Sequence, residues 1–382
     1  MKATAGVYAS CEVAVVGEVA VSESANEAGE GAGPELEAAP TAVGSLLAAS
    51  ILDVDGGPLT GRDLLAAGIV AGRWQRLESE LAEGLGLLAV DLVSKAEVTE
   101  QMRAFRLQRG LLSAEDMRAW MEPRGLSIGA VNAVAARVVA RRRGGAGTAP
   151  PPDEVAGAIV AEAICTGALT EIGWWLADRM LSAKATAADI TALALESVRV
   201  QRLVFSEACT IAGRASQEPG LLRAERIARI TALDDAYRSW EASVTGDADL
   251  SRRLREHELD WCRYELEELR LTLPGAAAEV ARQLAEGVDA REVAAAAGVP
   301  VAVHDVVLAD GSAELIRALT GAVAREVAGP WEEAGEHVVV RVRERHLPDT
   351  ADEQLVARAR AELVADATTR LRAGRVRWHD RA

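Results

Sequence analysis

The side chains that could carry out chemistry are scattered along the 382 residues of this chain. Its four cysteines are widely spaced and form no CxxC pair: Cys11, Cys165, Cys209 and Cys262. The sequence therefore supports neither a metal site nor a disulfide framework, and it favours reduced, buried thiols. It also contains no Walker loop, no HExxH and no GxGxxG motif. We accordingly expect no metal and no cofactor.

Two histidines lie in segments that alternate like strands. His304 falls within residues 301–308, and His337 opens residues 337–345. A strand histidine can simply make a local hydrogen bond, or it can face a ligand. Perturbed, paired groups are what mark a catalytic site. For His337 a role at a peptide site and a role as a plain strand-edge residue are both open.

The elements that would position these histidines follow from alternation and from Pro and Gly punctuation. We expect strands and short helices in this order: strand 266–273, helix 276–286, helix 290–297, strand 301–308, helix 312–319, strand 327–332 and strand 337–345. The last two strands form a hairpin. Such an order predicts a small antiparallel sheet with a few short helices.

The segment REVAGPWEEAGEHVVVRVRER, residues 325–345, resembles the close of a parvulin-type (PpiC-like) prolyl isomerase domain. There a GEVSGP segment precedes a GYHIIKV strand whose histidine faces the peptide groove. Such domains offer an apolar slot for proline and polar groups that favour the twisted amide, whose barrier is ~18–20 kcal/mol. The resemblance implies that His337 takes the place of the second family histidine, and the catalytic role if the domain is active. It also implies that Leu315 and Leu319 line the proline pocket and that Trp331 adds a wall.

Two departures from the family pattern point to a domain that binds without catalysis. The family's first strand begins HILV, whereas Glu268-Leu269-Arg270-Leu271 stands here without a histidine. The GGDLG loop is absent, and Val301-Ala302-Val303-His304-Asp305 takes its place. The alternative is that His304 takes the role of the missing histidine. We favour a degenerate, peptide-binding parvulin-like domain.

Segments on both sides of this domain resemble SurA- and PrsA-like chaperones. Residues 54–60, VDGGPLT, are similar to a VNGxxIT strand and turn, and Thr60 with Asp63 forms a capping box. Gly110-Leu111-Leu112-Ser113 is similar to a family helix junction, followed by a second box at Ser113 and Asp116. After a box at Thr350 and Glu353, apolar residues recur every four positions from 355 to 371. The resemblance implies that this helix and strand 376–378 pack on the N-terminal module, with Trp378 in its core.

The expected fold class is α+β and predominantly helical: a SurA-like helical chaperone module with a small antiparallel-sheet parvulin-like domain. The domain limits we expect are a disordered acidic tail (1–43), a SurA-like N-terminal helical module (44–143), a linker (144–152), a helical insertion (153–264), the parvulin-like domain (265–346), and a C-terminal helix and strand (347–382). The tail holds seven Glu and no Asp, and residues 13–16 within it have the pattern of a short strand. Four tryptophans of the insertion are core residues or, alternatively, line a peptide cradle: Trp174, Trp175, Trp240 and Trp261.

The net charge of −16 repels phosphate backbones, so we expect no nucleic-acid partner. The apolar window 155–176 is interrupted by Glu162 and Glu171, which predicts a buried helix and not a membrane span. We expect a cytoplasmic protein. Export is the alternative, because Tyr8-Ala9-Ser10-Cys11 faintly resembles a lipoprotein cleavage box.

Together these patterns predict a non-catalytic peptide-binding chaperone. The layout, with its long insertion, also resembles parvulin-related proteins that take part in maturation of ribosomally made peptides. The partners would be an unfolded or precursor peptide and its modifying enzymes. Two alternatives stay open: an active peptidyl-prolyl cis-trans isomerase, and a structural adaptor for a peptide-modifying enzyme.

Overall fold

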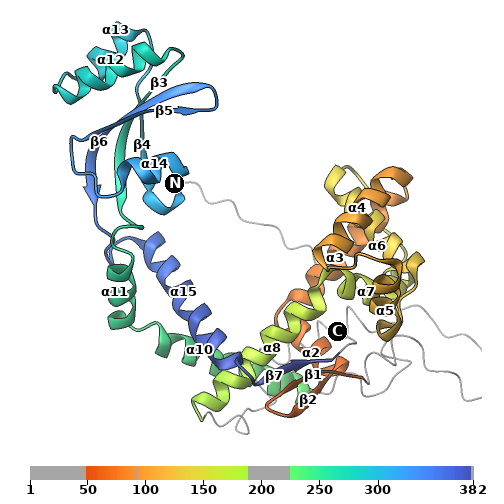
Figure 1. Cartoon of the computed structure of the whole chain (residues 1–382). Coiled ribbons are helices and arrows are strands. Elements are labelled where there is room, and N and C mark those ends of the chain that lie inside the picture. The colour runs from red at the N-terminus through yellow and green to blue at the C-terminus, as the bar shows by residue number, and fades with distance from the viewer. Residues whose placement is uncertain (1–48, 91–92, 188–223, 380–382) are drawn as a thin grey trace, which may run out of the picture. The chain divides into compact units, whose positions relative to one another are not determined.

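A computed structural model describes residues 49–90, 93–187 and 224–379. The expected acidic tail (1–43) with its strand at 13–16, Cys11 and Cys209 lie outside the described residues. So does the part of the helical insertion between residues 188 and 223. The described chain is predominantly helical and carries two small antiparallel sheets, which confirms the expected α+β class (Figure 1).

The first sheet has the order β2-β1-β7 and joins the two ends of the described chain. Its strands are β1 (Ser50–Val54), β2 (Gly57–Thr60) and β7 (Val376–Trp378). β1 and β2 form a hairpin whose turn residues Asp55 and Gly56 both have positive φ, as a two-residue primed turn requires. β7 pairs with β1, with Leu52 opposite Trp378.

Helices follow β2 in a compact group. They are α2 (Gly61–Val70), α3 (Arg73–Leu88), α4 (Lys95–Gln108), α5 (Ala114–Met121), the short 3₁₀ helix η1 (Glu122–Arg124) and α6 (Ile128–Arg143). The capping boxes predicted at Thr60 and Ser113 are present, and Ser94 begins α4 with a third. Each satisfies amides that the first helical turn leaves free.

Four further helices lie in the region expected as an insertion: α7 (Pro152–Thr166), α8 (Ala168–Ala185), α10 (Ala224–Val244) and α11 (Asp247–Glu256). α2, α8 and α10 share the largest core with β1. Trp240 and Trp261 are 5% and 2% exposed, so both are core residues. Among the described residues no single helix has the length and apolar character to cross a membrane, although the bent pair α7–α8 meets that test by composition.

The second sheet and its helices reproduce the expected element order. The elements are β3 (Arg263–Leu271), α12 (Pro274–Ala285), α13 (Ala290–Ala297), β4 (Ala302–Val307), η3 (Leu308–Asp310), α14 (Ala313–Leu319), β5 (Val327–Glu333) and β6 (Glu336–His346). The sheet has the order β4-β3-β6-β5 and is antiparallel throughout. One face packs on α12 and α13, the other on η3 and α14.

α15 (Glu353–Arg372) leads from this sheet back to β7. Four residues of its predicted stripe are buried, Leu355, Ala359, Leu363 and Ala367, and the fifth, Leu371, is half-buried. The predicted capping box at Thr350 and Glu353 is wrong, because Asp352 is the N-cap and accepts from the amides of residues 354 and 355. Asp352 also pairs with Arg263 of β3, a contact that a local pattern does not reveal. The domain limits given above stay predictions.

Candidate functional site

The sheet places the four predicted peptide-site residues on two different faces. His337 lies opposite Leu271, and it shares the α12–α13 face with Val339. Trp331 lies opposite Val338, and Leu315 and Leu319 pack with Val338 on the α14 face. Successive strand residues point to opposite faces, so His337 is turned away from the other three. The structure brings Leu315, Leu319 and Trp331 together and leaves His337 apart.

On the α14 face, the two leucines are core residues. Leu315 is 9% exposed and Leu319 is fully buried. The Tyr264 hydroxyl donates to the Leu319 carbonyl oxygen at 2.9 Å and fixes the end of α14 to β3. Burial raises the pKa of Tyr264 to about 12. Trp331 is half-buried beside this core, and its indole nitrogen has no hydrogen-bond partner among the described residues.

A charged cluster lies on the same α14 face as Trp331. Glu268, which begins the segment compared above with the HILV strand, accepts from Arg270 Nε at 2.6 Å. Arg270 also donates to Glu333 at 2.7 Å. His304 Nε2 is 3.6 Å from a Glu268 carboxylate oxygen, too long for a good hydrogen bond. The cluster is therefore a network of ion pairs across three strands, with His304 at its edge.

A second candidate is an open groove on the helical group formed by α4, α5 and the start of α6. We call it the methionine groove. Its volume is ≈ 580 Å³ and its wall is mostly apolar. The groove is lined by Thr99, Met102, Arg103, Arg106, Leu107, Leu111, Leu112, Ala114, Met117, Arg118, Met121 and Ile128. Three of the five methionines of the chain thus line one surface.

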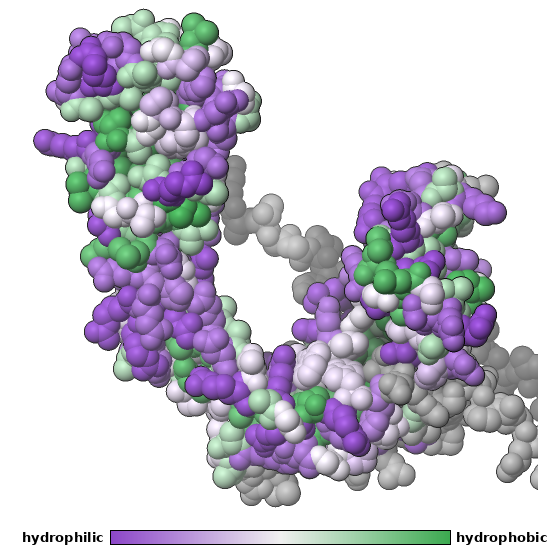
Figure 2. Space-filling view, viewed as in Figure 1, coloured by the Kyte–Doolittle hydropathy of each residue, from purple (hydrophilic) through white to green (hydrophobic). Residues whose placement is uncertain are grey.

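Three large apolar side chains of the groove are open to solvent. Leu107, Leu112 and Ile128 are 60%, 74% and 52% exposed. Figure 2 shows hydrophobic residues in green beside hydrophilic ones in purple on the part of the surface that carries α4 to α6 in Figure 1. Soluble proteins rarely leave large neighbouring apolar side chains exposed unless the patch binds something. This groove could not be predicted from the sequence, because it forms only where residues of α4, α5, their connection and α6 meet.

The connection between α4 and α5 explains why the groove exists. Gly110 has a φ of +67°, which reverses the chain after α4. Arg106 then holds the connection in place, since its Nε donates to the Leu111 carbonyl at 3.0 Å and its Nη2 to that of Leu112 at 2.9 Å. These two bonds keep the Leu112 side chain at the rim, where it is exposed.

A hydrophobic core cluster lies under the groove and shares Met102, Met117 and Met121 with it. The Phe105 and Trp120 rings meet edge to face at 5.4 Å, and the Arg109 guanidinium lies 4.1 Å above the Phe105 ring. Behind them, Arg137 pairs with the fully buried Glu162 at 2.8 Å. At the end of α6, Arg143 pairs with Glu97 of α4 at 2.5 Å. Hydrogen bonds from Arg143 and Ser94 lower the pKa of Glu97 to about 2.

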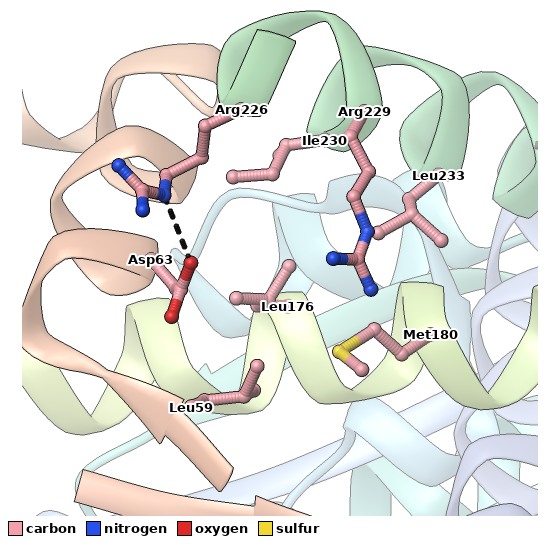
Figure 3. Close-up of a pocket in the computed structure, with 8 residues that line it drawn as sticks. All are labelled: Leu59, Asp63, Leu176, Met180, Arg226, Arg229, Ile230 and Leu233. Carbon is pink, nitrogen blue, oxygen red and sulfur yellow. Dashed lines mark hydrogen bonds and ion pairs between the residues drawn. The ribbon is translucent and has the colours of Figure 1, made fainter. Parts of the chain in front are cut away.

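A separate cavity, of ≈ 330 Å³, lies between β2, α2, α8 and α10 (Figure 3). The ion pair of Arg226 and Asp63, at 3.0 Å, lies on one side of it, and Met180 and Arg229 lie on the other. Leu176 and Ile230 of its wall are core residues. The residues that precede α10 lie outside the described residues, so we draw no function from this cavity.

Residues 125–129, Gly-Leu-Ser-Ile-Gly, match the GxSxG pattern of serine hydrolases. In those enzymes the serine lies on a sharp turn between a strand and a helix. Here the 3₁₀ helix η1 precedes it, and Ser127 is the N-cap of α6, with its Oγ accepting from the Ala130 amide at 3.1 Å. This serine is a helix cap. Across the described residues there is also no cluster of three or more His, Cys, Asp or Glu that could hold a metal ion.

Comparison with known proteins adds little to this geometry. No family model matches the chain, and no curated protein matches it. Among solved structures, the chain is similar to one of two structurally related SurA-like chaperones of Campylobacter jejuni. The identity is 7% and the TM-score 0.17, over 87% of this chain and 99% of that one. So low a TM-score carries no argument about function. The function is therefore argued from the residues described above.

Proposed function

We propose that this chain is a non-catalytic chaperone that holds unfolded or precursor polypeptide, with the methionine groove as one contact surface. The observation that carries the proposal is the exposure of Leu107, Leu112 and Ile128 around a groove that Met102, Met117 and Met121 line. The occupant we infer is a segment of non-native polypeptide with several apolar side chains. The SurA-like resemblance of the sequence agrees with this role.

Methionine suits a surface that has to accept many sequences. Its side chain is unbranched and polarizable, so it adapts to differently shaped apolar partners. The groove volume is in the range of ligand sites and gives room for a few side chains. A groove between helices would take an apolar stripe from an extended or helical segment. Breadth of clients at modest affinity is what a holding chaperone requires.

Aggregation assays would test this proposal directly. Leu107→Ser with Leu112→Ser removes exposed apolar surface without touching the core, so the variant should stay folded. We expect wild type to slow aggregation of a denatured client and the double variant to lose most of that effect. Leu259→Ser is the matched control, because Leu259 is 54% exposed and lies outside the groove. Equal protection by wild type and the double variant would rule out the groove as the holding surface.

Peptide contact by His337, Leu315, Leu319 and Trp331 stays a prediction. A single slot that contains all four would require the sheet to rearrange, because it separates His337 from the other three. A peptide on the α14 face would contact Trp331. A peptide on the α12–α13 face would contact His337, so one bound peptide would contact only one of the two residues. Binding-induced shifts in the spectra of the Trp331 indole and the His337 ring would show which face a peptide meets.

The alternative is an active prolyl isomerase. Exchange NMR on a short set of X-Pro peptides tests it, with wild type and His337→Ala. We expect no acceleration by either protein, because the segment compared above with the HILV strand has no histidine. Acceleration by wild type that His337→Ala abolishes would establish an enzyme, with His337 as its catalytic residue.

Two finer points extend the proposal. The first is that the client is a precursor peptide made on the ribosome and then modified, as the resemblance to peptide-maturation proteins suggests. The second is that the chain also acts as an adaptor for the modifying enzyme. A variant without residues 1–43 that still captures such an enzyme would argue against adaptor binding through the acidic tail. The cytoplasmic location remains a prediction.

A further inference from the structure

We propose that the methionine groove selects apolar segments that carry acidic residues on their flanks. The inference rests on the proposed function and specifies the chemistry of its client. Within the described part of the chain, the residues that line the groove include Arg103, Arg106 and Arg118 and no aspartate or glutamate. The whole chain has a net charge of −16, so a lining with only positive charge is a local reversal.

The arginines come from both helices that form the groove. Arg103 and Arg106 are three residues apart on α4 and so lie on one face of it, and Arg118 belongs to α5. Positive charge therefore accompanies the apolar wall along both helices. A client whose apolar residues enter the groove would bring its flanking residues close to these guanidinium groups.

Two of the three arginines are available to a client carboxylate. The Arg103 side chain is 72% exposed, and its contact with the equally exposed Glu100 is 3.8 Å long. Such a surface pair contributes little and can exchange partners. Arg118 is exposed and has no ion pair among the described residues. Arg106 differs, because two of its nitrogens already hold the Leu111 and Leu112 carbonyls.

Three acidic residues lie near Arg118 on α5 and η1, and none of them lines the groove: Glu115, Asp116 and Glu122. Asp116 is engaged in the capping box of α5, where its carboxylate accepts from the Ser113 amide at 2.7 Å. That hydrogen bond orients the Asp116 carboxylate toward the helix start, and hydrogen bonds with Ser113 lower its pKa. Asp116 is also absent from the groove lining. Guanidinium groups at a rim favour carboxylates through charge-assisted bonds and repel lysine or arginine flanks.

The probes for a test are three fluorescein-labelled peptides with one apolar core, flanked by two Glu, two Ser or two Lys on each side. Fluorescence anisotropy at low salt gives their dissociation constants. We expect the Glu-flanked peptide to bind about three- to tenfold more tightly than the Lys-flanked one, from exposed ion pairs with Arg103 and Arg118. The preference should shrink at high salt, because salt screens exposed charges.

Charge reversal supplies the decisive comparison. Arg103→Glu with Arg118→Glu should reverse the order of the Glu- and Lys-flanked peptides, and Arg103→Gln with Arg118→Gln should remove the preference. Both positions are exposed, so the variants should fold as wild type does, which circular dichroism checks. Arg291→Glu with Arg360→Glu is the matched control, with two exposed arginines outside the groove, and should keep the wild-type order.

The outcomes separate the two proposals. Equal binding of the three peptides to wild type would overturn acidic selection and leave the holding role in place. Binding of none of them would count against both. If the control variant also loses the preference for the Glu-flanked peptide, the preference comes from the overall charge of the chain. That result would overturn the role of the groove arginines.

Discussion

Trp378, in the C-terminal strand β7, lies directly against Gly173 of helix α8. A Cβ atom added to Gly173 would be 2.3 Å from the indole Cη2 atom, far inside van der Waals contact. The Trp174 ring meets the same indole edge to face at 5.4 Å. The glycine thus makes room for the tryptophan that fastens the end of the chain to the helical core.

Gly173→Ala should destabilise the protein. The added methyl group overlaps the Trp378 ring, and overpacking of this kind costs about 1–3 kcal/mol. Gly157→Ala is the matched control, since this glycine lies in helix α7 and an added Cβ meets nothing within 4 Å. The control should raise the free energy of unfolding by about 0.5–1 kcal/mol through helix propensity. Urea denaturation of both variants checks the opposite signs, and a stable Gly173→Ala protein would contradict the packing.

Asp178→Ala should also weaken the attachment of the C-terminal helix. The Arg372 guanidinium donates to the Asp178 carboxylate through Nε at 2.6 Å and Nη2 at 2.7 Å, which ties α15 to α8. The Asp178 side chain is only 10% exposed. Loss of hydrogen bonds to a charged group should cost about 1.5–3 kcal/mol.

The matched control for this ion pair is Glu171→Ala in the same helix. Glu171 pairs with Arg73 at 2.8 Å, but its side chain is 68% exposed. A surface pair of this kind contributes roughly 0–1 kcal/mol. Thermal unfolding of the two variants should show a clear loss for Asp178→Ala and a small one for Glu171→Ala. Similar losses would mean that burial does not strengthen the Arg372 pair.

The Cys165 thiol should resist alkylation in the folded protein. Cys165 is 4% exposed, and burial raises the pKa of its thiol to about 12. The thiolate is the reactive form, so at pH 8 its fraction should fall on the order of a thousandfold below that of an ordinary thiol. Timed iodoacetamide labelling followed by peptide mass spectrometry reads each cysteine separately. Fast modification of Cys165 without denaturant would contradict its burial.

The order of elements around the second sheet could be predicted from the sequence because local signals set it. Alternation marks β6, and the helix α13 begins at Ala290 and ends at Ala297, as Gly298 and Pro300 indicate. The buried stripe of α15 likewise follows from a period of four residues. In these segments, a short stretch of sequence is enough to determine whether a helix or a strand forms.

The positions of the candidate site residues could not be predicted in the same way. Which face His337 occupies depends on register, and one residue of slip moves a side chain to the other face. The N-cap of α15 is Asp352 and not the predicted Thr350. Asp352 also pairs with Arg263 in β3. The methionine groove needs α4, α5 and α6 to meet, and only tertiary packing provides that.

The stability of the helical group that carries the groove should fall in acid because of Glu97. Its pKa in the folded protein is about 2, below the ordinary value of 4.5, owing first to Arg143 and then to Ser94. A carboxyl group with a lowered pKa stabilises the fold above its unfolded pKa and loses that contribution as pH falls through the folded value. The stabilisation from Glu97 should therefore be complete at pH 6 and decline between about pH 4.5 and about pH 2.

Glu97→Gln isolates this charge. Glutamine can keep the capping box with Ser94 but not the ion pair with Arg143. We expect the variant to melt at a lower temperature than wild type at pH 7, and the difference to shrink between about pH 4.5 and about pH 2, where the unfolded wild-type chain binds a proton at Glu97 more readily than the folded protein does. Glu100→Gln is the matched control, since Glu100 is 74% exposed and 3.8 Å from Arg103. A difference for Glu97→Gln that stays constant from pH 7 to pH 2 would show that the charge of Glu97 does not join α4 to α6.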